Sequence, residues 1–290
     1  MTNVSNITIG PRRKMLRAMF FGPAAVGVLT GAVGVGTSIG WADPVFDTAV
    51  ESHSADTAAA MMSVSGRVPT AQVTPTVSSI DVAPAPIGVA ITASGNRAYI
   101  THMSTDRFYP KGTVSVIDTV SHKVLETVTV GVAPQRIAVS EASNKAYVTN
   151  YQDDTVSVLD VGAGTVAATI DVGSHPSGVA VAPDGKRAYV TNYQDDTVSV
   201  LDVGAGTVAA TIDVGSHPSG VAVAPDSRHA YVVNSEEVGT VTVIDTVKCT
   251  VSDRIEVGTN PVGVAVTPDG RQVYVSNINS STVSVISHAD

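Results

Sequence analysis

The sequence predicts an all-β protein in which about five four-stranded units follow one another. Three observations carry this prediction: the composition, a repeat of about 42 residues, and the pattern of short strands within each repeat. Val, Thr, Ala, Ser and Gly are abundant, and aromatic residues make up only 4% of the 290 residues. Branched and small residues suit strands and tight turns better than helices. The predicted architecture is therefore a β-propeller of about five blades.

The repeat is clearest in one stretch that occurs twice. Residues 146–184 read AYVTNYQDDTVSVLDVGAGTVAATIDVGSHPSGVAVAPD, and residues 188–226 repeat them letter for letter. Five tyrosines extend the same register with spacings of 48, 42, 42 and 43 residues, and a proline lies thirteen residues before each: Tyr99, Tyr147, Tyr189, Tyr231 and Tyr274. A period in the low forties is typical of a propeller blade or of a helical array.

The pattern inside one unit favours the propeller over the helical array. The second unit contains short, alternating, Val-rich runs at residues 136–140, 146–150, 155–160 and 165–172. None of them has the 3.6-residue period of a helix. The sequence Pro-Asp-Gly at residues 183–185 and 268–270 supplies a flexible glycine for a hairpin between the first two strands. Four strands in about 42 residues make one blade.

The two ends of the repeated region predict how the ring closes. The last unit stops after residues 283–286 and lacks a fourth strand, whereas residues 76–82 precede the first unit and align with the outer strand at residues 165–172. We therefore expect the N-terminal strand 76–82 to complete the last blade. Such closure hides an edge that would otherwise invite aggregation.

Two side chains recur in every blade in a way that packing explains. The tyrosines of the repeat lie in second strands, where a ring would fill the space between neighbouring blades. The asparagines that end those strands can satisfy free backbone groups in the turn, and they are Asn150, Asn192, Asn234 and Asn277. Catalytic groups are usually needed once, so both sets are interpreted as structural.

Residues 1–42 have the plan of a bacterial export signal. A basic cluster at residues 11–17 reads PRRKMLR, an uncharged Gly- and Ala-rich run follows to Gly40, and small residues precede a plausible cut after Ala42. The cluster resembles a twin-arginine signal, although Pro11 replaces the usual Ser or Thr. Residues 43–75 show no periodicity and are expected to form a flexible linker. An uncleaved membrane anchor in the leader is the alternative; after cleavage no membrane insertion is expected.

The charge balance argues against two classes of partner. Residues 1–42 hold four of the 17 basic residues and none of the 26 acidic ones, so the rest of the chain has a net charge of −13. A body this acidic repels phosphate backbones and anionic membrane surfaces, so nucleic acid is not an expected partner.

The motif at residues 147–150 and 189–192, YVTN, resembles the signature of the YVTN family of β-propeller repeats. The surrounding frame matches that family throughout residues 76–290. The resemblance implies a propeller on an exported or cell-surface protein of bacteria or archaea, and it implies no fixed chemistry. Familiar members have seven blades, so five blades is a departure that weakens any site carried over from them.

One face of the predicted propeller gathers candidate metal ligands. The loop after the second strand and the loop that enters the next blade emerge on the same side. Histidines and carboxylates there could bind a divalent cation; these residues are His175, His217, Asp153, Asp154, Asp195 and Asp196. The alternative to a specific metal site is a solvated acidic rim, with no cofactor and at most a weakly bound cation.

The first blade departs from the others by a longer second loop, residues 102–112. It reads HMSTDRFYPKG and contains two of the few aromatic residues. An inserted loop on a binding face often carries specificity. We therefore interpret Arg107, Phe108 and Tyr109 as candidate ligand contacts, together with His175 and His217.

The function that these observations favour is a non-catalytic binding or scaffold module that is exported, either secreted or held at the cell surface or periplasmic side of the membrane. Its expected partner is a protein or a glycan of the cell envelope. The alternative is a propeller enzyme with a site at the channel mouth, either a lactonase-like hydrolase or a metal- or quinone-dependent oxidoreductase. A third hypothesis is a structural surface protein that associates with itself.

Overall fold

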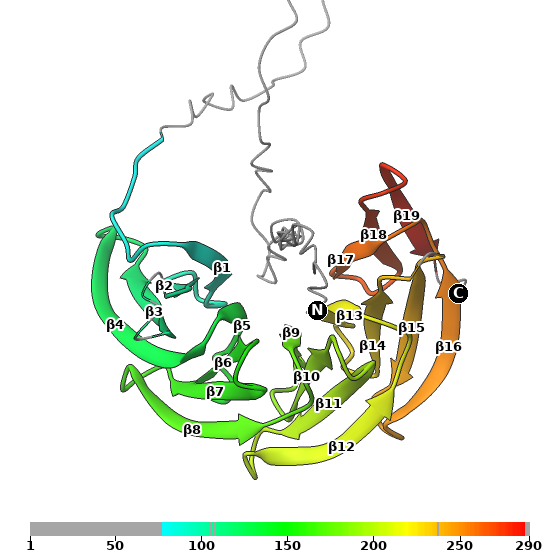
Figure 1. The fold of residues 1–290 in the computed structure, drawn as a ribbon, viewed down its shortest axis with the longest axis horizontal. Helices are drawn as coiled ribbons and strands as arrows, with labels where there is room; N and C mark the ends of the chain where they lie inside the picture. The colour runs from blue at the N-terminus through cyan, green and yellow to red at the C-terminus, as the bar shows by residue number, and fades with distance from the viewer. Residues whose placement is uncertain (1–76, 105, 107, 109, 237, 288–290) are drawn as a thin grey trace, which may run out of the picture.

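The chain folds into five antiparallel sheets arranged side by side along an arc (Figure 1). The structure is a computed structural model that describes residues 77–287 except 105, 107, 109 and 237. The predicted leader and linker, residues 1–42 and 43–75, lie outside the described residues. Every strand in the described part pairs only with antiparallel neighbours, and each sheet uses consecutive strands. The predicted all-β propeller architecture with about five blades is confirmed.

The first sheet contains the inserted loop, and the second sheet follows it along the chain. The first sheet contains β1 (Pro86–Ile91), β2 (Arg97–His102), β3 (Lys111–Asp118) and β4 (Lys123–Val132). The second contains β5 (Pro134–Ser140), β6 (Lys145–Asn150), β7 (Thr155–Asp160) and β8 (Thr165–Asp171). The four strands predicted for the second unit agree with β5–β8 to within two residues at each end.

The remaining sheets repeat this plan. The third contains β9 (Pro176–Val181), β10 (Arg187–Asn192), β11 (Thr197–Asp202) and β12 (Thr207–Asp213). The fourth contains β13 (Pro218–Val223), β14 (His229–Asn234), β15 (Thr240–Asp245) and β16 (Thr250–Glu256). The fifth contains β17 (Pro261–Val266), β18 (Gln272–Asn277) and β19 (Thr282–Ser287). The first strand of each sheet lies innermost and the fourth lies outermost (Figure 1).

The core consists of apolar layers between neighbouring sheets. A typical layer joins Tyr189 and Val200 of the third sheet to Val221, Val232 and Ile244 of the fourth. Equivalent layers join the first sheet to the second, the second to the third, and the fourth to the fifth. The tyrosines are the largest side chains in these layers. Burying an aromatic ring of this size stabilises the fold because it removes a large apolar area from water. The predicted packing role of the tyrosines is therefore confirmed at four positions: Tyr99, Tyr147, Tyr189 and Tyr231, each at most 1% exposed.

The fifth tyrosine is different. Tyr274 is 42% exposed, and Val283 and Val285 on β19 are also exposed. Their counterparts in the third sheet, Val198 and Val200, are fully buried. The outward face of the fifth sheet has the composition of a blade interface but carries no neighbouring sheet in the described part of the chain.

The predicted ring closure is wrong for the described residues. The fifth sheet has three strands, and residues 77–82 lie outside any strand, with Val77 96% exposed. The packed layers place the first and fifth sheets at opposite ends of the arc, so the N-terminal segment does not reach the fifth sheet (Figure 1). The segment 77–82 is tied to β1 by three residues, so it stays with the first sheet. Strand pattern can be read from sequence, whereas the rotation between blades depends on side-chain packing.

The predicted hairpin turns form, but of the strand-ending asparagines only Asn150 bonds to a backbone group among the described residues. Gly185 adopts a φ of 68°, and its N–H donates to the Ala182 carbonyl at 2.8 Å. Asn150 accepts a bond from the Gly131 N–H at 3.1 Å and donates to the Thr155 and Ser157 hydroxyls. Asn150 therefore ties the outer strand of the first blade to the inner strands of the second. The other three asparagines donate to the equivalent hydroxyls of their own blades, and their side-chain oxygens accept no hydrogen bond from the described residues.

Candidate functional site at the junction of the first two blades

The acidic side chains of the rim are engaged with the backbone. Asp153 accepts a hydrogen bond from the Val132 N–H at 2.7 Å, and Asp154 accepts one from the His175 N–H at 2.8 Å. The next blade repeats both bonds: Asp195 accepts from the Ser174 N–H at 2.7 Å and Asp196 from the His217 N–H at 2.8 Å. Asp153 and Asp195 therefore join the second-strand loop to the turn that enters their own blade, and Asp154 and Asp196 join it to the turn that enters the next blade.

The two candidate histidines lie in equivalent turns of successive blades. His175 and His217 adopt φ angles of 55° and 52°, as Ala85, Ala133 and Asn260 do at the same position of the other blades. Their rings pack against Tyr151 and Tyr193, with centroids 4.6 Å and 4.8 Å apart. The turn geometry therefore recurs whether or not the residue is a histidine.

The structure does not gather the candidate ligands into one cluster. Within residues 77–287, apart from the four gaps, no group of three or more His, Cys, Asp or Glu side chains could hold a metal ion. The carboxylates and histidines are instead distributed over successive blade junctions. Weak cation binding by this rim stays a prediction.

The inserted loop emerges between β2 and β3. Phe108 is 89% exposed, and its N–H donates to the Asp106 carboxylate at 2.8 Å. Arg107 and Tyr109, the other two predicted contacts, lie outside the described residues. At the end of the loop, a Cβ on Gly112 would collide with the Pro134 ring, so the loop returns directly against the start of β5. This places the insertion at the junction of the first and second blades.

His102, the first residue of the insertion, replaces the asparagine that ends the second strand in every other blade. Its side chain is 1% exposed. Burial lowers the pKa of His102 because desolvation disfavours the protonated ring. The imidazole is therefore neutral at physiological pH, and it lies in the interior of the first blade.

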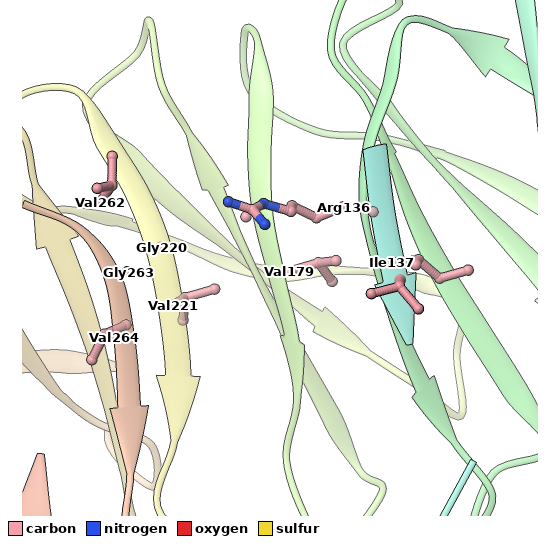
Figure 2. Close-up of a pocket in the computed structure, with 11 residues that line it drawn as sticks. Arg136, Ile137, Val179, Gly220, Val221, Val262, Gly263 and Val264 are labelled. Carbon is pink, nitrogen blue, oxygen red and sulfur yellow. The ribbon is translucent and has the colours of Figure 1, made fainter. Parts of the chain in front are cut away.

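A second departure from the repeat lies on the axis of the arc. Four blades begin with Pro-X-Gly-Val, at residues 86–89, 176–179, 218–221 and 261–264, but the second blade begins with Pro-Gln-Arg-Ile at 134–137. A small cavity of about 60 Å³ is bounded by the innermost strands of all five sheets. Figure 2 shows the Arg136 side chain extended into the space between these strands. Arg136 is the one charged residue among the described residues that line it; the others are Gly88, Val89, Ile137, Gly178, Val179, Gly220, Val221, Val262, Gly263 and Val264.

The position of Arg136 normally requires glycine. A Cβ on Gly88 would lie 2.6 Å from the Gln135 carbonyl oxygen, and one on Gly220 would lie 2.6 Å from the Val262 carbonyl oxygen. Arg136 nevertheless keeps the hydrogen bond that the glycines make, since its N–H donates to the Thr149 hydroxyl at 3.0 Å as the Gly178 N–H does to Thr191. Departures from a local structural rule are expected at functional sites.

Sequence reasoning missed Arg136, although the signal was available. Aligning the five prolines places Arg136 against four glycines, which is the kind of single-copy change that a repeat makes visible. A further hollow at the same junction, between the first and second sheets, is lined in part by Lys111, Gly131 and Asp153. Three departures therefore meet at the junction of the first two blades: the inserted loop, His102 and Arg136.

In the described part of the chain, no helix has the length and apolar character needed to cross a membrane.

Comparisons with known proteins agree with this fold. A family model described as lactonase, 7-bladed beta-propeller, matches residues 188–290, little more than a third of the chain. Hydrazine synthase of Kuenenia stuttgartiensis is similar in structure, with a TM-score of 0.62 and 27% identity over 70% of this chain. The chain spans 58% of that protein's length. No curated protein matches the sequence.

A functionally unknown protein from Desulfotomaculum acetoxidans shares the fold with a TM-score of 0.63. The match covers 75% of this chain and 74% of that protein, at 17% identity. Together with the partial match to the model of 7-bladed lactonase propellers, these similarities show that the described part of the chain has a β-propeller fold.

Proposed function

We propose that this chain is a non-catalytic binding module, exported by its N-terminal leader, that engages a protein or glycan of the cell envelope. The observation that carries this proposal is the convergence of three departures from the repeat at the junction of the first two blades. A binding surface needs one place where the repeated blades differ, and this junction supplies it.

The engagement of the rim carboxylates supports a binding role over a catalytic one. General acid–base and metal-assisted hydrolysis need carboxylates or histidines that are directed at a substrate. Asp153, Asp154, Asp195 and Asp196 accept backbone N–H bonds at 2.7–2.8 Å instead. On this proposal, ligand contacts come from the exposed loop, in which Phe108 offers a large apolar ring.

A lactonase-like hydrolase is the second candidate, because the family model that matches residues 188–290 describes lactonases. The two functions separate in one experiment with the purified full-length chain. We expect no turnover of γ- and δ-lactones above the rate in buffer, with or without added Ca²⁺, Mg²⁺, Mn²⁺ or Zn²⁺. Lactone turnover that rises in proportion to protein concentration would contradict the non-catalytic role.

The place of binding is tested by capture from the native envelope. We expect the wild-type chain to retain a partner that is lost when residues 104–110 are replaced by a short Gly-Ser turn. The matched control replaces the turn at residues 193–196 in the third blade, which belongs to the repeated frame, and it should retain the partner. Equal capture by the wild-type chain and the loop variant would remove the inserted loop from the binding surface.

A further inference from the structure

We propose that a second copy of the chain completes the fifth sheet, by adding its segment 77–82 as a fourth strand along the outer edge of β19. The segment and the edge are both without a strand partner in the described part of the chain, and one copy holds them at opposite ends of the arc (Figure 1). The inference concerns the assembly of the protein and does not rest on the proposed binding function.

The acceptor is the outer edge of β19. In the other four sheets the third strand pairs with a fourth, whereas β19 pairs only with β18 among the described residues. Val283 on β19 is 62% exposed, although its counterpart Val156 in the second sheet is fully buried. β19 contains no charged residue and no proline, which are features that protect an edge from pairing, whereas β16 at the edge of the neighbouring sheet carries three charged residues. The edge of β19 is therefore suited to accept an added strand.

The donor segment has the sequence of an outer strand. Residues 80–82 read Ile-Asp-Val, as residues 170–172 do where β8 ends. In the second sheet Ile170 pairs with Val156, and both side chains are buried. Residues 77–82 lie in no strand, and the first three are exposed. The segment is therefore available to form the strand that its sequence favours.

The repeat specifies the register of the added strand. Val283 occupies the place in β19 that Val156 occupies in β7, since both follow a threonine that pairs with the asparagine of the second strand. The pair of Ile170 and Val156 thus becomes Ile80 of one copy opposite Val283 of the other. Both apolar side chains then lie on one face of the sheet, where cross-strand contact stabilises the pairing.

The position of the segment explains why the edge belongs to another copy. Only residues 83–85 join the segment to β1, and the Ala85 carbonyl accepts the Met103 N–H at 3.1 Å, so the segment stays beside its own first sheet. Each copy has one donor segment and one acceptor edge. Two copies that exchange their segments therefore form a closed pair, as domain-swapped dimers do.

Cysteine cross-linking between copies tests the pairing. Ile80→Cys and Val283→Cys are made in separate full-length chains, each with Cys249→Ser so that no native cysteine remains. We expect the mixture of the two chains to form a disulfide-linked dimer roughly tenfold faster than the control mixture, because strand pairing raises the effective concentration of the thiols. The control mixes Ile80→Cys with Val247→Cys, which lies on an exposed turn of the fourth blade.

Sedimentation velocity of the full-length chain gives a second measurement. We expect the mass of the wild type to rise from one copy toward two with increasing concentration. Val283→Lys places a charge on the pairing edge and should weaken this association roughly tenfold or more. Val247→Lys makes the same change at a similarly exposed valine and should associate as the wild type does.

Three results would overturn the proposal. They are equal cross-linking in the two mixtures, sedimentation of the wild type as one copy at every concentration, and a disulfide within one chain alone when Ile80→Cys and Val283→Cys are combined. The last result would mean that the chain closes on itself. Lactone turnover, or capture of a partner without the inserted loop, bears on the proposed function alone and leaves this assembly standing.

Discussion

Identical stretches of 39 residues begin in the second and third blades, at residues 146 and 188, yet the strands that open these two blades differ, most sharply where arginine replaces glycine. Within the copied stretch, two pairs of identical residues have equivalent surroundings: Tyr147 and Tyr189 are both buried, and Asp154 and Asp196 both accept a backbone N–H at 2.8 Å. Just before it, Arg136 stands where the third blade has Gly178. The comparison teaches that the repeated letters build blade interfaces, and that function is to be sought where the copies disagree.

The tyrosines offer the largest test of the repeated frame. Tyr189→Ala should lower the free energy of unfolding by about 3–5 kcal/mol, because it leaves a cavity in a packed layer. Tyr147→Ala should also cost about 3–5 kcal/mol, since this ring is buried in an equivalent layer that contains Leu201 where the layer of Tyr189 contains Ile244. Tyr274→Ala should cost less than about 1 kcal/mol because that ring is 42% exposed. Urea denaturation of the three variants measures all of this.

A large loss for Tyr274→Ala would show that the outward face of the fifth sheet is covered in solution. The exposed composition of that face would then belong to an interface that the described residues do not include.

Gly178 of the third blade and Arg136 of the second occupy the same position, and substitutions there test how strongly sterics favour glycine. A Cβ on Gly178 would lie against the Ser219 carbonyl, closer than any real contact allows. Gly178→Ala should therefore cost about 1–3 kcal/mol in the free energy of unfolding. Arg136→Gly should cost less than Gly178→Ala, because it restores the residue that the fold favours. The reverse order, measured by urea denaturation, would mean that the Arg136 side chain stabilises the fold more than the glycine of the other blades does.

The buried histidine makes stability depend on pH. Because burial lowers the pKa of His102 in the folded state, the unfolded chain binds a proton more readily, with an ordinary pKa of about 6.5. Stability is therefore full above that pH and falls as the pH drops below it, by at most about 1.4 kcal/mol per pH unit. His102→Asn, which introduces the residue of the other blades, should lose this part of the pH dependence between pH 7.5 and 5.

Urea denaturation of both proteins at several pH values checks the prediction, and the remaining histidines are common to both. An unchanged difference in stability between the wild type and His102→Asn across this range would show that His102 does not titrate as its burial implies.

The rim carboxylates should give the smallest effects. Asp154→Ala and Asp196→Ala each remove one exposed acceptor of a backbone N–H, which should cost about 0.5–1 kcal/mol. The two values should agree, because the blades are copies. Thermal unfolding with and without added Ca²⁺ measures both effects. A stabilisation by Ca²⁺ that both variants lose would contradict the purely structural role of these carboxylates.

Much of the fold could be predicted because it is repeated. The five tyrosines, their prolines and the asparagines that end second strands gave the register, the strands of each blade and the buried positions. The closure of the ring could not be predicted, because residues 76–82 have the letters of an outer strand while the rotation between sheets depends on packing. Tyr274 occupies the sequence position of the buried tyrosines but is exposed, because no sixth sheet packs against it in the described part of the chain.

The site was predicted only in part. The inserted loop was proposed as a candidate from its length, and His175 and His217 from their residue type, and these assignments stay predictions. The engagement of Asp153 and Asp154 by backbone N–H groups depends on how the turns of neighbouring blades meet, which sequence does not show. Arg136 was not predicted, because its position shows only when the innermost strands of the five blades are aligned, and the place of its side chain depends on how those strands meet.

Capture of a partner from the native envelope tests the central claim most directly. The account predicts that the full-length chain retains a partner and that the chain with residues 104–110 replaced by a short Gly-Ser turn does not. Equal capture by the two chains would contradict the account.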